Sequence, residues 1–172
     1  MHWEGSQPFR RDLGGGALLD AAVYPMGLAQ MIFGTFTEIH ATGMIGQSGV
    51  DEQTAILCRA EGGRFALAQA AITTTFKGDA TIYGTEGMIV IPGNFTNPPW
   101  CELHRPGREP EHHDFTPTLH RLSWQAEAFQ WYVTRGETDA YLAPRVATLE
   151  VARVLDEARH QIGLPPVPEV TL

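Results

Sequence analysis

The stretch 14–34, GGGALLDAAVYPMGLAQMIFG, decides how the rest of the chain is interpreted. Its three consecutive glycines leave the backbone free to adopt positive φ or to pass close to another group. A helical period follows, and Gly34 can end a helix in a left-handed conformation without a Cβ penalty. The sequence therefore predicts one helix between the two glycine signals. Its expected buried stripe consists of Leu19, Val23, Met26 and Ile32.

Asp20 and Tyr24 are four positions apart in this expected helix. Side chains at that spacing lie on one helical face, about one turn from each other. A carboxylate and a phenol close to a helix start that follows glycines form a candidate site. The alternative interpretation is that Asp20 pairs locally and Tyr24 packs as an ordinary aromatic side chain.

Length and charge restrict the class of protein. The chain has 172 residues, of which 43% are hydrophobic, as expected for one globular domain. Its net charge is −8, and Lys77 is the only lysine among 12 basic residues. A nucleic-acid surface needs clustered positive charge, so we expect no nucleic-acid partner.

The sequence also restricts the expected compartment. No apolar run approaches the 18 residues or so of a membrane span, and no signal peptide is recognised before the domain. Cys58 and Cys101 are isolated, so no disulfide framework is indicated. We therefore expect no membrane partner and a reducing, cytoplasmic setting.

Short strands separated by turn signals are predicted between residues 36 and 92. They cover residues 37–45, 53–60, 64–74, 79–83 and 88–91, and Glu61-Gly62-Gly63 is a hairpin signal. The strand 64–74 is apolar on both faces. One face has Phe65, Leu67 and Gln69, and the other has Ala66, Ala68, Ala70 and Ile72. Such a strand needs cover on both faces, and helices can cover one of them.

The segment 93–120 is rich in proline, and residues 100–104 and 111–115 are predicted to be two edge strands. It also contains four histidines, and imidazole is a good zinc ligand. These are His104, His112, His113 and His120. Their spacing matches no standard ligand pattern, and adjacent histidines in a strand point to opposite faces. We expect solvated histidines and no metal site.

Two helices are expected to close the domain. Residues 121–135 have a helical period that ends before Gly136, and Pro144 suits the first turn of the last helix. The expected buried stripe of that last helix is Leu149, Ala152, Leu155, Ala158 and Ile162.

The order helix, strands, helices predicts an α+β fold, in which an open, mostly antiparallel β-sheet has helices packed on one face. We expect an N-terminal arm over 1–13, one α+β domain over 14–164 and an extended tail over 165–172.

Four stretches of the chain, in order, resemble segments of the second domain of the Gfo/Idh/MocA oxidoreductases. They are GGGALLDAAVYPMGLAQMIFG, GVDEQTAILCRAEGG, GDATIYGTEGMIVIP and LEVARVLDEARHQIG, which lie between about residues 14 and 164. The family pattern is Gly-Gly-Gly, then Asp, then His or Tyr four residues later. Asp20 matches the Asp, and Tyr24 resembles the members that have tyrosine.

The resemblance implies a substrate-binding and oligomerisation domain. In the family, NAD or NADP is held by a preceding dinucleotide-binding domain with a Glu-Lys-Pro motif, and this chain contains neither that motif nor a strand–GxGxxG–helix unit. We therefore expect no cofactor on this chain alone, no cofactor-binding residues in it, and no activity from it alone.

The resemblance also implies site residues and partners. Asp20 and Tyr24 are the expected catalytic residues, and Gly15 and Gly16 would lie at the substrate pocket. Gly27 occupies a position where many members have Asp or Asn. The implied substrate is a sugar, inositol, diol or related polyol. A homodimer or higher homo-oligomer is expected through the open sheet face, which we expect to be the alanine-rich face of strand 64–74. An intramolecular sandwich is the alternative.

Two other function classes stay open from the sequence. One is a stand-alone binding or scaffolding module that has kept the fold and lost the cofactor domain, as the missing Glu-Lys-Pro motif and Gly27 suggest. The other is a histidine-based metalloenzyme, for which the histidines of segment 93–120 are the only motive.

Overall fold

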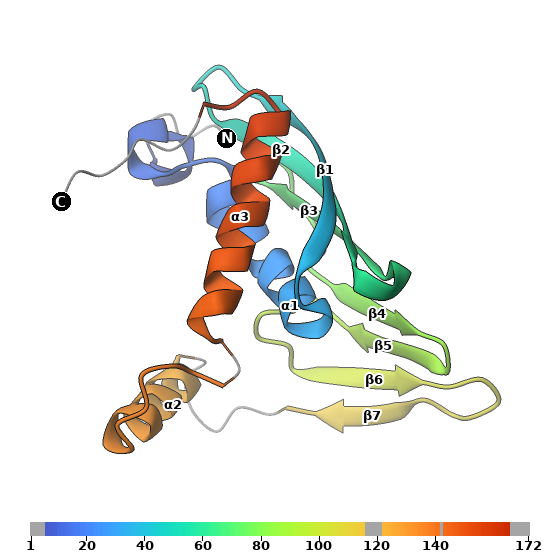
Figure 1. Ribbon diagram of the computed structural model, residues 1–172. Helices are drawn as coiled ribbons and strands as arrows, with labels where there is room; N and C mark the ends of the chain where they lie inside the picture. Colours follow the sequence, from blue (N-terminus) through green and yellow to red (C-terminus); the bar gives the residue numbers. More distant parts are fainter. Residues whose placement is uncertain (1–5, 116–121, 142, 166–172) are drawn as a thin grey trace. The chain divides into compact units, whose positions relative to one another are not determined.

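The computed structural model describes residues 6–115, 122–141 and 143–165 (Figure 1). Two compact units make up the chain: Met1–Phe76 with Asp139–Leu172, and Lys77–Thr138. The first unit contains a three-stranded sheet with helices α1 and α3, and the second contains a four-stranded sheet and helix α2. Residues 1–5 of the predicted arm, residues 166–172 of the predicted tail and His120 lie outside the described residues.

The first unit begins with two short 3₁₀ turns, followed by a helical run that starts as a π-helix and continues as an α-helix. The turns are Gln7–Phe9 and Arg11–Leu13. Leu18–Ala22 then forms a π-helical turn, which continues into α1 at Val23–Phe33. Pro25 explains the change of helix type, because it has no N–H to donate to the carbonyl four residues earlier and its ring crowds that carbonyl. Helix α1 ends at Gly34, as predicted.

The buried stripe of this run differs from the predicted one. It consists of Leu18, Ala22, Met26 and Ala29, so of the predicted set only Met26 is buried. A π-turn has more residues per turn than an α-helix, and the stripe through it therefore follows a spacing of four residues. The sequence pattern assumed a uniform α-helix and was wrong about the stripe for this reason.

Three antiparallel strands follow in the order β1-β2-β3. They are β1 Phe36–Ile45, β2 Asp51–Ala60 and β3 Phe65–Ala71, and the predicted hairpin at Glu61–Gly63 joins the last two. The pairing of Ile39 with Cys58 and of Cys58 with Ala66 places these three residues on one face of the sheet. Helices α1 and α3 lie on this side (Figure 1).

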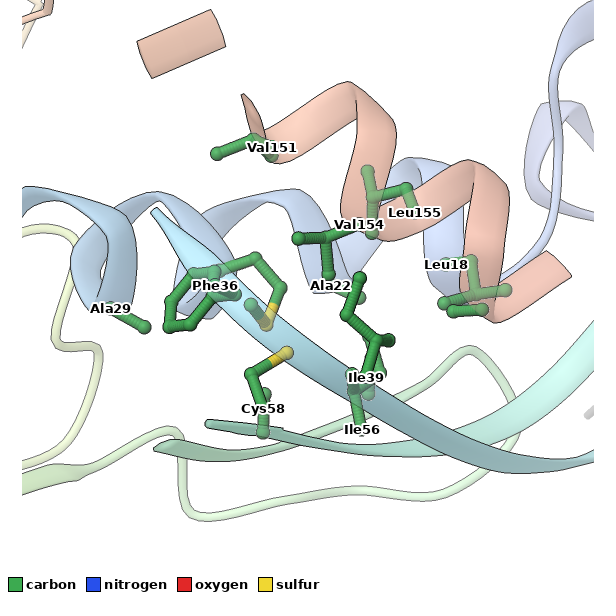
Figure 2. Close-up of a cluster of buried hydrophobic side chains, with 14 of the residues drawn as sticks. Leu18, Ala22, Ala29, Phe36, Ile39, Ile56, Cys58, Val151, Val154 and Leu155 are labelled. Atoms are coloured by element: carbon green, nitrogen blue, oxygen red, sulfur yellow. The ribbon is translucent and has the colours of Figure 1, made fainter. Parts of the chain in front are cut away.

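Helix α3, Arg145–Gln161, closes the core of the first unit. Its buried apolar residues are Ala147, Val151, Val154, Leu155 and Ala158. Figure 2 shows that Val154 and Leu155 point toward the side chains of Leu18, Ala22 and Ile39. Complete burial of an apolar side chain of this size stabilises a fold by about 1.5–3 kcal/mol. The segment 14–34 and the last helix thus share one core.

The buried face of α3 is rotated about the helix axis relative to the predicted stripe, so the prediction was wrong for part of the helix. Leu155 and Ala158 are buried as expected, whereas Leu149 is 70% exposed and Ala152 is also exposed. Two overlapping sets of apolar residues follow the helical period in α3, and Leu155 and Ala158 belong to both sets. Packing against β1 and α1 selects between them.

The second unit contains a four-stranded antiparallel sheet in the order β4-β5-β6-β7. Its strands are β4 Ala80–Gly84, β5 Gly87–Ile91, β6 Trp100–His104 and β7 Glu111–Asp114. Helix α2 spans Ser123–Thr134. Every strand predicted from the sequence is present, and the predicted α+β class with antiparallel pairing is confirmed. The strands form two hydrogen-bonded sheets.

The helical run Arg11–Phe33 also meets a membrane criterion that the sequence analysis missed. The run has 23 residues, and its most apolar window of 18 residues has a mean hydropathy of 1.3, which by length and composition alone is enough to cross a bilayer. The expectation that no stretch approaches a membrane span is corrected in this respect. In the structure, Leu18, Ala22 and Met26 of this run belong to the core of the first unit, which is the arrangement of a core helix.

Candidate functional site

The glycine loop 14–16 places the helical run against the rest of the first unit. Gly15 and Gly16 donate their N–H groups to the carbonyls of Arg10 and Pro8, both at 2.9 Å. A Cβ on Gly15 would lie 2.6–2.8 Å from the carbonyl oxygens of Gln7, Pro8 and Arg10. Both glycines are buried by the chain itself. A direct contact of either with substrate remains a prediction, and their observed role is to let the chain pass closely.

Asp20 lies in the π-turn and Tyr24 in the first turn of α1, and both side chains are exposed. Tyr24 has 58% of its surface accessible. Within the residues that the structure describes, neither side chain has a hydrogen-bond or ion-pair partner. The predicted pair is therefore presented to solvent next to a π-turn, a feature that is frequent at functional sites. Gly27, one turn further on, has open space where a side chain would be.

Asp51 is a feature of the site region that the sequence analysis did not single out. It is the first residue of β2 and fully buried, and its Oδ2 accepts the N–H of Leu18 at 2.7 Å. The hydroxyl of Thr54 donates to the same oxygen at 2.9 Å. Burial raises the pKa of Asp51, against the lowering effects of these two hydrogen bonds and of the charge on Arg159. The predicted strand 53–60 began two residues after Asp51, so the sequence analysis left this residue outside any element.

Two histidines of the second unit, His104 and His112, lie next to carboxylates. Glu102 Oε2 lies 2.9 Å from His104 Nε2, and Glu102 Oε1 lies 3.2 Å from His112 Nδ1. His112 Nε2 lies 3.2 Å from Asp114 Oδ1. The hydrogen bond to Glu102 raises the pKa of His112 and lowers that of Glu102. In the described part of the chain, no three such groups are placed to hold a metal ion.

The sheet of the first unit has one covered face and one open face, and the assignment from the sequence was wrong. The alanine-rich face packs inward, since Ala68 and Ala70 are buried in the core. The open face has Phe65, 67% exposed, and Leu67, 66% exposed, with Leu57 paired to Leu67. Helices prefer the small side chains, because these let a helix approach the sheet closely. An apolar patch of large side chains is left exposed.

A shallow depression lies elsewhere, along the outer surface of α3. Leu149, Ala152, Arg153, Asp156 and Glu157 line it. All of them come from consecutive turns of one helix, and none belongs to the run that carries Asp20 and Tyr24. Its open, charged surface does not resemble an enclosed substrate pocket.

Comparison with known protein families identifies the family of this domain. The GFO/IDH/MocA C-terminal domain matches residues 2–90, just over half of the chain. The chain belongs to this family. The glycine loop, the helix with Asp20 and Tyr24 and the first sheet all lie inside the matched region of this GFO/IDH/MocA domain.

Two characterised relatives of this GFO/IDH/MocA domain are dehydrogenases. A trans-1,2-dihydrobenzene-1,2-diol dehydrogenase of Xenopus tropicalis is 29% identical over 161 residues, which cover 90% of this chain and 49% of that protein. A scyllo-inositol 2-dehydrogenase (NADP(+)) of Bacillus subtilis is 27% identical over 157 residues, covering 91% of this chain and 47% of that protein. The chain spans about half the length of the curated relatives it matches.

A solved structure supports the same fold for nearly the whole chain. The aldose-aldose oxidoreductase of Caulobacter crescentus, complexed with glycerol, superimposes with a TM-score of 0.78 at 16% identity. The match covers 94% of this chain and 50% of that one. Both units of this GFO/IDH/MocA domain therefore have a counterpart in a known fold.

Proposed function

We propose that this chain is the substrate-binding and oligomerisation domain of an oxidoreductase that transfers hydride between NAD or NADP and a sugar, inositol, diol or related polyol. The observation that carries the proposal is the match of about nine-tenths of the chain to about half of two dehydrogenases. One of these acts on a diol and the other on an inositol with NADP(+), as their names state.

Asp20 and Tyr24 would carry the chemistry of this domain. A tyrosine hydroxyl can donate to a substrate oxygen or relay its proton, and a neighbouring carboxylate can orient it. Their exposure and their lack of partners among the described residues support this role, because a substrate can reach both groups. The π-turn supports it further, since it presents Asp20 on the side opposite to the buried Leu18 and Ala22.

The nicotinamide cofactor would be held outside this chain. A dinucleotide loop follows a β-strand and leaves its glycines open to the pyrophosphate. The loop 14–16 follows a 3₁₀ turn, and its last two glycines are buried against backbone carbonyls and Asp51. These residues do not fit the cofactor. We therefore propose that the chain alone binds neither NAD nor NADP and has no catalytic activity alone.

The open face of the first sheet would form the oligomer contact. Large apolar side chains are exposed there: Leu57 lies beside Leu67 on the neighbouring strand, and Phe65 lies two residues before Leu67 on the same face. Burial of such a patch against a second copy removes apolar surface from water on both sides of a symmetric interface.

A second candidate function is a stand-alone binding or scaffolding module without catalysis. The observation that favours it is Gly27, which supplies no polar group at the position where many family members have Asp or Asn. A gene that encodes no dinucleotide-binding segment in frame with this chain would support the module, and an in-frame segment would remove it.

Calorimetric titration of the purified chain with NADH and with NADPH, together with its mass in solution, tests the main proposal. We expect no heat of binding and a mass of twice the 18.9 kDa of one chain. Binding at micromolar cofactor would show that a nucleotide site lies within the chain, and the assignment of the domain would be wrong. A mass of one chain would remove the oligomerisation role.

A further inference from the structure

The start of the helical run is held by a residue 33 positions away in the sequence, since Asp51 accepts the N–H of Leu18. The first four N–H groups of a helix have no partner inside the helix, and a carboxylate supplied from elsewhere satisfies one of them. Its negative charge is also favourable at a helix N-terminus. Asp51 therefore caps the helix from β2, although no side chain of the adjacent sequence does so.

The fit between this carboxylate and the glycine loop is tight. A Cβ on Gly16 would lie 2.3 Å from Asp51 Oδ1, and the φ of Gly16 is +113°. Thr54 holds the other carboxylate oxygen from the same strand. A side chain at position 16 would thus displace the cap, and glycine is required for this approach.

Stability alone is a poor explanation for a carboxylate in this place. Asp51 Oδ1 is buried and has no hydrogen-bond partner among the described residues, and burial of a carboxylate is costly when it is not fully paired. The nearby positive charge is Arg159, which is itself buried and donates from Nη2 to the carbonyl of Pro165 at 2.9 Å. What the carboxylate does supply is a fixed position for the first amide of the π-turn.

We infer that Asp51 is a positioning residue: its bond to Leu18 fixes the start of the π-turn and so the direction in which Asp20 and Tyr24 project. Asp20 lies two residues and Tyr24 six residues beyond the amide that Asp51 holds. That Asp20 and Tyr24 face a substrate rests on the proposed function. That Asp51 fixes their direction does not.

Nuclear magnetic resonance of the ¹⁵N-labelled full chain tests the inference without a substrate. In Asp51→Ala we expect hydrogen exchange of the Leu18 amide to become about tenfold faster or more, since a capping bond is lost. The Asp20 and Tyr24 resonances should shift with it. Asp51→Asn keeps an acceptor oxygen and should restore most of the protection.

Glu150→Ala is the matched control. It removes the acceptor of the Phe36 amide, a bond of 2.8 Å in the same unit, and the hydrogen bonds found for Glu150 among the described residues are those with Phe36 and Arg153. It should lower the melting temperature and leave the Asp20 and Tyr24 resonances in place. If Glu150→Ala moves these resonances as much as Asp51→Ala does, or if Asp51→Ala leaves them unmoved, the inference is overturned.

Thr54→Val keeps the test decisive if Asp51→Ala does not fold. It removes one of the two hydrogen bonds to Oδ2 at nearly constant volume. We expect a smaller acceleration of Leu18 exchange, together with shifts of the Asp20 and Tyr24 resonances away from their wild-type positions. An unchanged spectrum at these three residues contradicts the positioning role.

Titration with scyllo-inositol separates this inference from the proposed function. A shift of the Tyr24 resonance in the wild-type chain that is lost in Asp51→Ala supports both. If the wild-type chain does not respond while Asp51→Ala still displaces Asp20 and Tyr24, the polyol proposal fails and the positioning role stands. An equal response in both proteins removes the positioning role.

Discussion

Gln161 is hydrogen-bonded to the free edge of β1 at Ile39: its Nε2 donates to the Ile39 carbonyl at 2.8 Å, and its Oε1 accepts the Ala41 N–H at 2.7 Å. One side-chain amide of α3 thus pairs with the edge strand as a backbone peptide group would. Glu150 and Arg153 do the same at Phe36, whose N–H and carbonyl they satisfy at 2.8 and 2.7 Å. Edge strands that keep free backbone groups are prone to pair with other chains.

Gln161→Ala should therefore lower the free energy of unfolding by about 1–2 kcal/mol and increase aggregation, because it frees two backbone groups of β1. Urea denaturation and light scattering measure the two effects. Gln130→Ala in α2 is the control, since no hydrogen bond of its side chain is found in the described residues. A change as large in the control as in Gln161→Ala would show that loss of the edge contact is not the cause.

Two glycines near the start of the chain should respond to alanine in opposite directions. Gly27 lies inside α1, where an added Cβ meets no atom within 4 Å, so Gly27→Ala should stabilise the chain by about 0.5–1 kcal/mol. Gly16→Ala should destabilise it by about 2 kcal/mol or more, because the Cβ would overlap Asp51 and φ is positive. Thermal unfolding of both variants measures the difference. A change of the same sign in both variants would contradict the close approach of Gly16 to Asp51 or the open space at Gly27.

Leu67→Glu should reduce the mass in solution from twice 18.9 kDa to that of one chain while the circular dichroism spectrum is kept. A charge on the open face of the sheet would have to be buried in the proposed contact between copies. Leu149→Glu is a matched control, because Leu149 is 70% exposed against 66% for Leu67 and lies on α3. Loss of association in the control, or a dimeric Leu67→Glu, contradicts the proposed interface.

His112 should titrate above the ordinary histidine value of 6.5, since its hydrogen bonds to Glu102 and Asp114 raise its pKa. Because the pKa of His112 is higher in the folded state than the ordinary value of 6.5, its ion pairs stabilise the folded state fully below pH 6.5. This stabilisation is lost as the pH rises through the folded-state pKa. Because the pKa of Glu102 is lower in the folded state than the ordinary value of 4.5, its hydrogen bonds stabilise the folded state fully above pH 4.5. This stabilisation is lost as the pH falls through the folded-state pKa. The β6–β7 pair should thus be most stable between about pH 4.5 and 6.5.

Glu102→Gln tests the origin of that shift. The His112 pKa, followed by its ring proton resonances, should fall toward its ordinary value. His113, whose neighbour across the sheet is Cys101, lies on the other face of β7 and serves as the internal control. A His112 titration that is unchanged in Glu102→Gln contradicts the ion-pair assignment.

The two cysteines should react at different rates. Burial raises the pKa of Cys58 to about 11, and the thiolate is the reactive form. Cys101 is only partly buried. A thiol reagent at pH 8 should therefore modify one thiol of the native chain and the second only after denaturant is added, and mass spectrometry of the digested chain identifies which. Rapid modification of Cys58 in the native chain would show that the core of the first unit opens readily.

The sequence by itself determined the element types and their order. Turn signals and helical period act over a few residues, so the strands, the hairpin at Glu61–Gly63 and the stop of α1 at Gly34 could be predicted. The family pattern also identified Asp20 and Tyr24 as candidates. Pro25 is the one local signal for the π-turn, and a helical period alone does not distinguish a π-turn from an α-helix.

Only the tertiary structure decided which faces are covered and what holds the candidate site. Leu149 and Leu155 are equally apolar, and the contact of α3 with β1 decides that only Leu155 is buried. The face of β3 with Ala68 and Ala70 and the face with Phe65 and Leu67 are both apolar. The helices cover the alanine face, because small side chains let a helix approach the sheet closely. The bond from Asp51 to Leu18 joins residues 33 positions apart, so no local pattern contains it. Burial and long-range hydrogen bonds depend on packing between distant segments, and that is settled only when the chain has folded.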